Sequence, residues 1–405
     1  MRLNRHALAC AVLALGAASQ ASAQFSGDTV RIGVLTDMAG PYSGMGGAGS
    51  VVAARMAVED CLKADCQGMK IDVVSADHQN KADIAATKTR EWLDRDGVDA
   101  IADITNSAAA LAVQKLVREK GGIALYSGPA TTRLTDEECA ENGFHWMFDT
   151  YSSASGAAAA LTRNGDKSWY FITVDYAFGH SLEKDARAMV QANGGTVVGS
   201  VRHPLNASDF SSFILQAQNS KAQVIGLANG AQDTVNAIKA AREFGIGTKD
   251  QKVASLLMFL TDVHSLGLRQ AQGLMFSEGF YWDMDDKTRA FATRFEKLHK
   301  GYKPTLVQAG VYSSVLHYLK SVAAAKTDES KAVARKMREL PIDDPVMRNA
   351  SIRPDGRVIH DMYLFQVKAP NESKGAWDYY KTVSTIPAAT AFKPLAQSSC
   401  PLVKQ

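Results

Sequence analysis

The chain has 405 residues, 45 Lys and Arg against 42 Asp and Glu, and a formal net charge of +3. Charge this close to balance excludes the dense basic surface by which proteins bind nucleic acid. A chain of this length exceeds one ordinary hydrophobic core, so at least two lobes are expected.

The N-terminus has the pattern of a secretory signal peptide. Arg2 and Arg5 precede an uncharged apolar stretch at residues 7–18, and Ala21-Ser22-Ala23 forms an A-x-A cleavage site. The stretch is too short for a stable membrane anchor, and no later segment is long and apolar enough to cross a bilayer. We therefore expect residues 1–23 to be removed and the mature protein, with a formal charge of about +1, to reside in the periplasm.

Four cysteines remain after that cleavage, namely Cys61, Cys66, Cys139 and Cys400. An even number in an oxidising compartment indicates disulfides, and four cysteines allow three pairings. We favour Cys61–Cys66 as a short loop and Cys139–Cys400 as a tie for the C-terminal tail. Zinc is disfavoured because Cys139 and Cys400 are single and far apart, so no metal site is expected.

Strand and helix patterns alternate along the first half of the chain. In the first run, strands are predicted at residues 30–36, 70–76, 99–103 and 123–126, with helices at 51–62, 82–95 and 109–117. In the second run, strands are predicted at residues 169–174, 196–201, 224–228 and 253–259, with helices at 182–190, 209–219 and 235–241. The remainder is predicted to hold strands at 273–282 and 357–367 and helices at 287–300, 305–325 and 331–340.

Two successive runs of this kind predict an α/β protein with two doubly wound parallel-sheet lobes. Three chain crossings, near residues 144–152, 273–282 and 349–357, would form the hinge. The expected lobes are residues 24–147 with 279–353 and residues 148–278 with 354–390, followed by a tail at 391–405. Ligands of such sheets bind beyond the carboxyl ends of the strands, so a cleft between the lobes is the expected site.

A glycine-rich segment follows the first strand, and Gly44 to Gly49 matches G-x-G-x-x-G. A nucleotide site is disfavoured because the strand ends well before Gly44 and Asp77, the next acid at a strand end, comes too late. A turn that brings the backbone close to a bound anion is preferred, although a surface turn without a ligand stays open. Tyr42, within the same loop, is a candidate ligand residue.

Two loops at strand ends of the first run carry hydroxyl groups. Thr105, Asn106 and Ser107 lie between a predicted strand and helix, where helix capping and anion binding are about equally expected. The segment 127–132 leaves the fourth strand, and its candidate ligand contacts are Gly128, Ala130 and Thr131.

In the second run, Tyr176 and Phe178 follow the first strand and are expected to form an apolar wall. Asn229 and Asp262 end later strands and are candidates for a polar ligand group, with helix capping by Asp262 equally plausible. Tyr281 lies at a predicted crossing, where it lines the cleft mouth or packs the hinge.

Catalytic patterns are weak. Ser181 and Lys184 match S-x-x-K, but the companion motifs of penicillin-binding enzymes are absent from the sequence, which makes a periplasmic hydrolase the least favoured hypothesis. No cofactor is expected.

The ordered set of motifs resembles the leucine/isoleucine/valine-binding family of type I periplasmic binding proteins. The resemblance rests on Val30–Thr36 with Gly40-Pro41 and Gly46, on the segment 128–131, and on the segment 175–179. It implies two Rossmann-like lobes, three crossovers, closure on a ligand and no catalysis. It also implies that Thr105 to Ser107 and Gly128 to Thr131 grip a ligand carboxylate, with Tyr176 and Phe178 covering it.

Amino-acid binders of this family place an acid of the second lobe against the ligand ammonium, and Asp262 could serve. Asn229 stands where an aromatic residue is frequent in the family, which favours the subgroup that binds aromatic or related organic acids over α-amino acids. The implied function is a monomeric solute receptor that delivers its ligand to the membrane permease of an ABC importer. A sensor of the same fold that serves a signalling receptor is the alternative.

Overall fold

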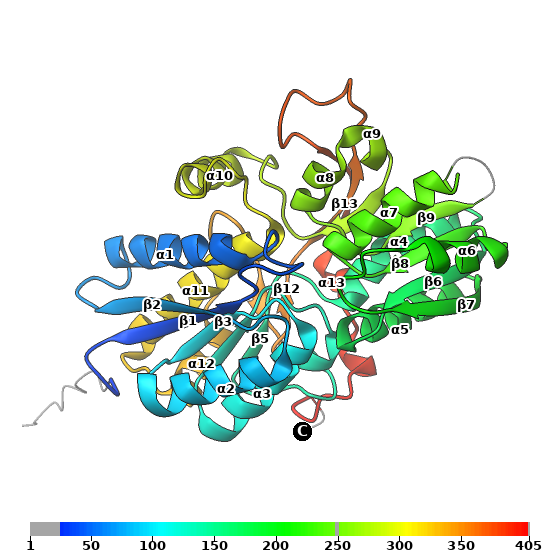
Figure 1. Cartoon of the computed structure of the whole chain (residues 1–405). Helices are drawn as coiled ribbons and strands as arrows, with labels where there is room; N and C mark the ends of the chain where they lie inside the picture. Colours follow the sequence, from blue (N-terminus) through cyan, green and yellow to red (C-terminus); the bar gives the residue numbers. More distant parts are fainter. Residues whose placement is uncertain (1–24, 248–250, 404–405) are drawn as a thin grey trace, which may run out of the picture.

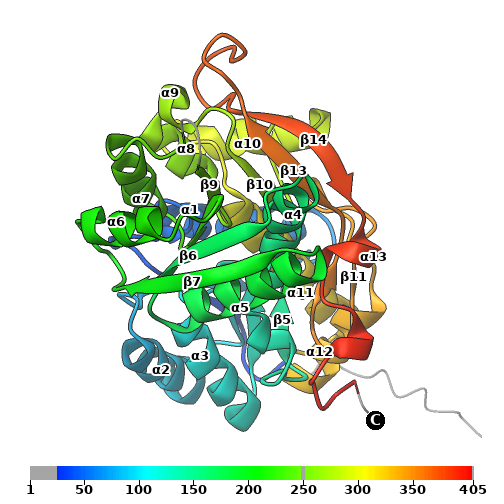
Figure 2. The same cartoon turned by 90° about the vertical axis from the view of Figure 1, so that its right-hand side faces the viewer.

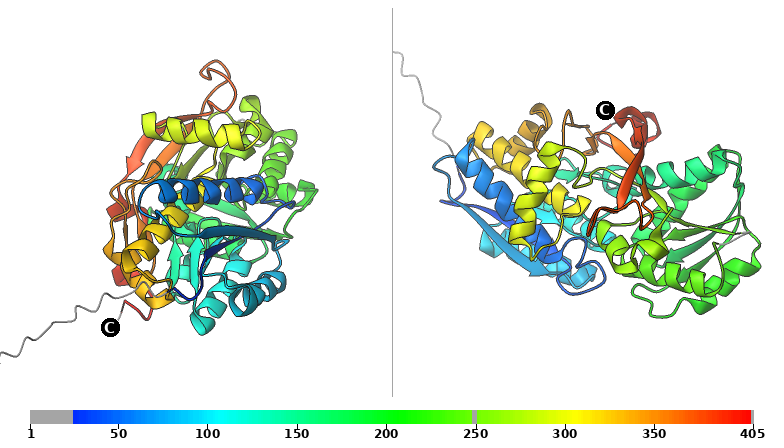
Figure 3. Two further views of the ribbon diagram at one scale, coloured as in Figure 1. Left: turned by 90° about the vertical axis from the view of Figure 1, so that its left-hand side faces the viewer. Right: turned by 90° about the horizontal axis from the view of Figure 1, so that it is seen from above.

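The computed structural model describes residues 25–247 and 251–403, so the predicted signal peptide at residues 1–23 lies outside the described chain. Two α/β lobes lie side by side (Figures 1 and 3), and the predicted fold class is confirmed. Among the helices of the described residues, none combines the length and the apolar character that crossing a membrane requires.

The first lobe contains a five-stranded parallel sheet in the order β2-β1-β3-β4-β5. Its inner strands are short apolar runs because helices cover both of their faces. These strands are β1 (Val30–Thr36), β2 (Ile71–Asp77), β3 (Ala100–Asp103), β4 (Ile123–Tyr126) and β5 (Gly143–His145).

Helices from two distant parts of the chain cover this sheet. On one face lie α1 (Gly47–Lys63), α10 (Asp286–Leu298), α11 (Leu306–Ala325) and α12 (Ser330–Glu339), and on the other lie α2 (Ala82–Glu91), its π-helical extension Trp92–Asp96 and α3 (Ser107–Lys120). The yellow helices in Figure 1 therefore return to the blue lobe after the chain has built the green one.

The second lobe contains a four-stranded parallel sheet in the order β7-β6-β8-β9. The strands are β6 (Ser168–Val174), β7 (Thr196–His203), β8 (Val224–Ala228) and β9 (Lys252–Ser255), and the covering helices are α4 (Thr150–Arg163), α5 (Ala177–Ala192), α6 (Ser211–Asn219) and α7 (Gln232–Glu243). Next to α4, a three-stranded antiparallel sheet in the order β10-β13-β14 runs along the side of the molecule (Figure 2).

The remaining elements are short and cluster around the hinge and the C-terminus. They are α8 (Leu260–Leu266), α9 (Leu268–Ala271), β10 (Met275–Glu278), β11 (Ser351–Ile352), β12 (Val358–Ile359), β13 (Met362–Val367), β14 (Tyr380–Ile386), α13 (Ala388–Ala391) and two 3-10 turns, Thr132–Thr135 and Leu395–Gln397.

A fully buried arginine joins two of the chain crossings. The guanidinium of Arg357 donates to the carbonyl oxygens of Trp146 (2.8 Å) and Phe148 (2.9 Å), and it lies 3.7 Å from the carboxylate of Asp149. The same group stacks over the ring of Phe392 at 4.2 Å. Since a buried charge is tolerated only where it is paired and hydrogen-bonded, these contacts fix the third crossing against the first.

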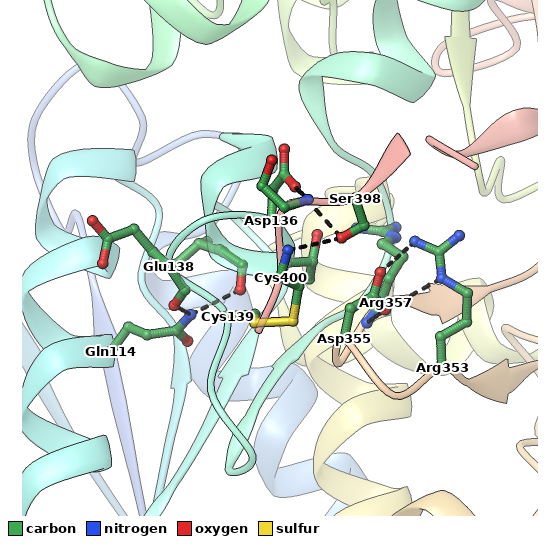
Figure 4. The surroundings of a disulfide bond; sticks show 12 residues. Gln114, Asp136, Glu138, Cys139, Arg353, Asp355, Arg357, Ser398 and Cys400 are labelled. Carbon is green, nitrogen blue, oxygen red and sulfur yellow. Dashed lines mark hydrogen bonds and ion pairs between the residues drawn. A yellow bond between two sulfur atoms is a disulfide. The ribbon is translucent and has the colours of Figure 1, made fainter. Parts of the chain in front are cut away.

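Both favoured disulfides are present. Cys61, in the last turn of α1, pairs with Cys66 in the turn that follows the helix, and Cys139 pairs with Cys400 across 261 residues of sequence. Asp136, three residues before Cys139, also binds the tail: its carboxylate accepts from the Ser398 hydroxyl (Figure 4) and from the backbone N–H of Ser399. The C-terminal segment is thereby fastened to the first lobe.

Several predicted boundaries were wrong. The strand expected at 253–259 ends at Ser255, the strand expected at 273–282 covers only Met275–Glu278, and the strand expected at 357–367 is broken at residues 360–361. Apolar loop residues that line a cleft or a hinge carry the same sequence signal as a buried strand, which explains these errors. β5, α4, α8, α9 and β14 were not predicted.

Candidate ligand-binding cleft

The carboxyl ends of six parallel strands, three from each lobe, lead into loops that meet around one space. Parallel strands place their carboxyl ends at one edge of a sheet, and the two sheets turn these edges toward each other. The loops of the two lobes approach each other closely, and the space left between them is about 10 Å³, room for about one water molecule. It is lined by Tyr42, Met45, Thr105, Ser107, Gly128, Ala130, Tyr176, Phe178, Gly230, Leu257 and Phe259.

Asp37 folds the loop that carries Tyr42. Its carboxylate accepts hydrogen bonds from the backbone N–H groups of Gly40 (2.7 Å) and Tyr42 (2.9 Å) and from the side-chain amide of Asn80 (2.6 Å). Three donors on one buried carboxylate hold the backbone after β1 in a single conformation. The sequence interpretation did not identify Asp37.

The hydroxyl of Thr105 is arranged to donate. Its oxygen accepts from the backbone N–H of Asp37 (3.1 Å) and lies 3.0 Å from Nε2 of His78. Nδ1 of His78 accepts from the N–H of Asn80 (3.0 Å), and burial lowers the pKa of His78 to about 4, so the neutral ring carries its proton on Nε2. With both lone pairs of the hydroxyl engaged, Thr105, which lines the cleft, has only its own hydroxyl proton left to donate.

Ser107 is arranged in the same way. Its Oγ accepts from the backbone N–H groups of Ala130 and Thr131, each at 3.3 Å. A hydroxyl has two lone pairs and one proton, so this group too is left as a donor. Ser107 is also the first residue of α3, where the positive end of the helix dipole faces the cleft.

The second lobe contributes an aromatic wall. Tyr176 and Phe178 lie at the start of α5 with ring centroids 5.9 Å apart, and Phe259 packs beside them from the loop that precedes α8. The hydroxyls of Tyr42 and Tyr176 are 2.6 Å apart and form a hydrogen bond between the lobes. One tyrosine must donate to the other, so the pair keeps one more proton for a ligand. Burial raises the pKa of both hydroxyls, which stay neutral.

The lining of this space combines hydroxyl groups with apolar side chains. None of its residues carries a charge, and its polar side chains are hydroxyls. The hydroxyl oxygens of Thr105 and Ser107 already accept two hydrogen bonds each from the protein, so these hydroxyls can only donate. Such a surface matches an acceptor-only group, such as a carboxylate, together with an apolar body.

Seven residues that the sequence analysis proposed lie around this space, namely Tyr42, Thr105, Ser107, Gly128, Ala130, Tyr176 and Phe178. The other five lie elsewhere. Asn106 caps α3 by accepting from the N–H groups of Ala108 and Ala109 at 2.9 and 3.1 Å. The hydroxyl of Thr131 lies 2.6 Å from that of Ser181, so it forms a contact between the lobes.

Asn229 and Tyr281 are committed to protein partners. The amide of Asn229 bonds to His203 (3.0 Å) and to the hydroxyl of Thr234 (2.7 Å). Tyr281 donates to the carbonyl oxygen of Trp377 at 2.9 Å and stacks on Tyr380 within the antiparallel sheet. Both side chains are therefore held by contacts with other residues of the protein, and neither lines the cleft.

Asp262 lies beside the space without lining it. Its carboxylate accepts from the backbone N–H of Phe259 at 2.9 Å and so caps α8. Burial raises the pKa of Asp262 to about 7. The residue borders a second hollow, which is also lined by the 39–45 loop and by the start of α7.

Four lining residues were missed, namely Met45, Gly230, Leu257 and Phe259. Leu257 and Phe259 had been assigned to a strand that ends earlier, at Ser255. Gly230 is the neighbour of the proposed Asn229. The usable signal was position, since Gly230, Leu257 and Phe259 each lie within four residues of a strand end, and Met45 lies in the loop between β1 and α1.

The S-x-x-K pair does not form a nucleophile and base. The Ser181 hydroxyl bonds to Thr131, and Lys184 is exposed. Within residues 25–247 and 251–403, no cluster of His, Cys, Asp and Glu has the form of a metal site.

Comparison with known proteins agrees with this architecture. A crystal structure of a periplasmic binding protein from Burkholderia mallei is 49% identical with a TM-score of 0.90, over 93% of this chain and 99% of that one. A branched chain amino acid ABC transporter periplasmic ligand-binding protein from Burkholderia xenovorans LB400 is 42% identical with a TM-score of 0.82, over 93% and 100%. The Leu/Ile/Val-binding protein homolog 6 of Brucella melitensis is 24% identical, over 93% of this chain and 96% of its own length.

The family model described as periplasmic binding protein matches residues 29–376. The resemblance found in the sequence is thereby confirmed, and members of this group are solute-binding proteins of ABC transporters. The chain belongs to the periplasmic binding protein family.

Proposed function

We propose that this protein is a periplasmic receptor that closes two lobes over a small carboxylate and delivers it to the permease of an ABC importer. The observation that carries the proposal is the pair of hydroxyls, Thr105 and Ser107, whose lone pairs are filled by protein donors. The lobe boundaries given above, at residues 147/148, 278/279 and 353/354, are part of this proposal.

We further propose that the ligand is a carboxylic acid without an α-ammonium group, with an aromatic or branched apolar body. An ammonium needs a carboxylate partner, and the lining contains none. Two acids of the second lobe lie near the lining and both are engaged: Asp262 caps α8, and Asp233, whose charge acts on Tyr42 and Tyr176, accepts from the backbone N–H groups of Asn206 and Ala207. Tyr176, Phe178 and Phe259 offer flat apolar surface to the body of the ligand.

The test is a thermal-shift screen of the mature protein with matched pairs of ligands. The pairs are leucine with 4-methylpentanoate and phenylalanine with 3-phenylpropanoate, which differ only in the ammonium, and benzoate is added as a compact aromatic acid. Selective binding to the folded state raises the melting temperature. We expect shifts with the acids alone; shifts with the amino acids alone would contradict the ligand class, and no shift with any carboxylate would contradict the function.

Two variants locate the site. Thr105→Val and Ser107→Ala each remove a hydrogen bond to a charged group, a loss of about 1.5–3 kcal/mol or roughly 10–100-fold in affinity. Asp262→Asn is the control, since it conserves the shape of a residue that the acid ligand does not touch. Unchanged affinity in both hydroxyl variants would refute the site.

A further inference from the structure

A buried carboxyl lies directly behind the cleft, and the function proposed above does not use it. Asp103 is the last residue of β3 and is 0% exposed, and among the described residues neither of its side-chain oxygens accepts a hydrogen bond of good geometry. The hydroxyls of Thr36 and Ser50 lie near enough to favour its ionised form, but no cation in the described part of the chain does so. An unpartnered carboxyl in a protein interior is costly and calls for an explanation.

Asp103 lies next to two residues that line the cleft, Thr105 and Gly128. A Cβ atom added to Gly128 would lie 2.6 Å from Oδ1 of Asp103, and one added to Gly46 would lie 2.8 Å from Oδ2. The two glycines thus form a slot for the carboxyl group. Gly128 and Thr105, two residues along, both line the cleft, so only a backbone layer separates the carboxyl from the ligand space.

The backbone at this point is strained. Asp103 and Ile104 have φ angles of 76° and 57°, in the left-handed region that side-chain-bearing residues seldom adopt. The carbonyl oxygen of Asp103 accepts from the N–H groups of Ser127 and Gly128, at 3.4 and 3.3 Å. Strain of this kind persists where the neighbouring structure enforces it and is concentrated at functional sites.

We propose that Asp103 is a positioning residue whose carboxyl must be neutral for an anionic ligand to bind, so that binding of a carboxylate is coupled to the uptake of a proton by Asp103. This inference rests on the proposed function. The physical reason is that an ionised Asp103 would put a negative charge close behind donors that hold another negative charge. In a water-poor site such a repulsion is weakly screened.

The groups that face Asp103 do not supply a compensating cation. From the end of β1, Asp37 adds a further negative charge and the Thr36 hydroxyl a weak dipole; from α1 comes the Ser50 hydroxyl. His78, beyond Thr105, is neutral, and Tyr126 on the neighbouring strand has a pKa raised by burial.

The raised pKa of Asp103 supports the proposal that the geometry suggests. Burial raises the pKa of Asp103 to about 7, although the nearby hydroxyls oppose that shift. A bound anion would raise it further by like-charge repulsion. Proton uptake on binding therefore makes the affinity fall as the pH rises through and above neutrality.

The experiment is isothermal titration calorimetry of the mature protein with benzoate from pH 6 to pH 9, in two buffers of different ionisation enthalpy at each pH. Benzoate stays ionised over this range. We expect the dissociation constant to rise on the order of 100-fold across it, and the buffer dependence to show uptake of about half a proton per benzoate at pH 7 and of nearly one proton at pH 9. In Asp103→Asn both effects should vanish while binding persists.

The controls separate the possible failures. Asp262→Asn and Asp233→Asn each remove a further carboxyl near the cleft whose pKa is raised by burial; if uptake were lost in either variant and kept in Asp103→Asn, the assignment to Asp103 would be overturned. Binding of benzoate without pH dependence or proton uptake would overturn the coupling and leave the proposed function intact. Absence of binding by any acid at any pH would overturn both.

A second measurement does not depend on the variant folding. The carboxyl carbon of Asp103 in the wild-type protein is titrated by NMR with and without benzoate, and its midpoint should move upward with ligand. An unchanged midpoint overturns the proposal. Because the folded-state pKa is raised, the neutral carboxyl stabilises the fold fully below its unfolded-state pKa, and that contribution is lost as the pH rises through about 7.

Discussion

The two lobes bring different chemistry to the same space. The first lobe supplies donors, Thr105 and Ser107, whose orientation is set by backbone and side-chain contacts. The second lobe supplies chiefly apolar surface, with Phe178 and Leu257 among its lining. Hydrogen bonds depend steeply on angle and distance, whereas burial of apolar area has no direction. The contacts that require exact geometry therefore lie on the lobe whose backbone and side-chain contacts fix their donors.

The covalent cross-links follow the same division. Cys61, Cys66 and Cys139 belong to the first run of strands and helices, and no cysteine lies between residues 148 and 390. The tail cysteine, Cys400, is tied to the first lobe and not to the second. The lobe that presents the hydrogen-bond donors is thus also the lobe that carries the disulfides.

The largest effect is expected for the long disulfide. Replacing Cys139 and Cys400 by Ser opens a loop of 261 residues and should lower the free energy of unfolding by about 5 kcal/mol. The Cys61→Ser/Cys66→Ser variant opens a loop of only 5 residues and should cost about 2 kcal/mol. Urea unfolding measures both, and equal losses would show that loop length does not control the effect here.

The next effect concerns the slot behind the donors. Gly128→Ala places a Cβ atom 2.6 Å from Oδ1 of Asp103 and 2.7 Å from the Cα of Thr105. The neighbouring backbone must shift, at a cost of about 2 kcal/mol, and affinity for benzoate should fall with it. Gly27→Ala is the matched control because no atom lies within 4 Å of its added Cβ. Equal melting temperatures for the two variants would contradict the close packing of Gly128 against Asp103 and Thr105.

The wall of the second lobe is tested by Phe178→Ala. Removal of this buried ring should weaken binding of 3-phenylpropanoate by about 2 kcal/mol, roughly 30-fold, because the ligand loses apolar contact. Phe213→Ala truncates a ring on α6 that packs on Phe210 and His203, so it should leave affinity unchanged. Calorimetric titration compares the two, and similar losses would indicate a general effect on the fold.

The smallest effect is expected for the contact between the tyrosines. Tyr176→Phe removes the 2.6 Å hydrogen bond to Tyr42 and keeps the ring. One neutral hydrogen bond contributes about 1 kcal/mol, so affinity should fall about fivefold. Tyr170→Phe, on β6, is the control for loss of a tyrosine hydroxyl. A loss as large as that of Phe178→Ala would mean that the second lobe also contributes a directional contact.

Much of the fold was available from the sequence. Alternating apolar runs gave β1, β4 and β8 their observed bounds, since buried parallel strands must be short and apolar. The loops after these strands could be named as the site region because ligands bind at strand carboxyl ends. The individual roles within the loops were less accessible. Asn106 and Asp262 turned out to be caps, and Asn229 to be a partner of His203.

The sequence by itself determined the alternation of strands and helices, the two runs, the cysteines available for pairing and the hydroxyl-rich loops, because these depend on local periodicity and on residue type. Only the tertiary structure decided which hydroxyls are left as donors, because that depends on which distant groups fill their lone pairs. The same holds for Asp103, whose carboxyl is enclosed by Gly46 and Gly128 from distant parts of the chain. Contacts between segments far apart in the chain leave no periodic trace in it, so packing alone reveals them.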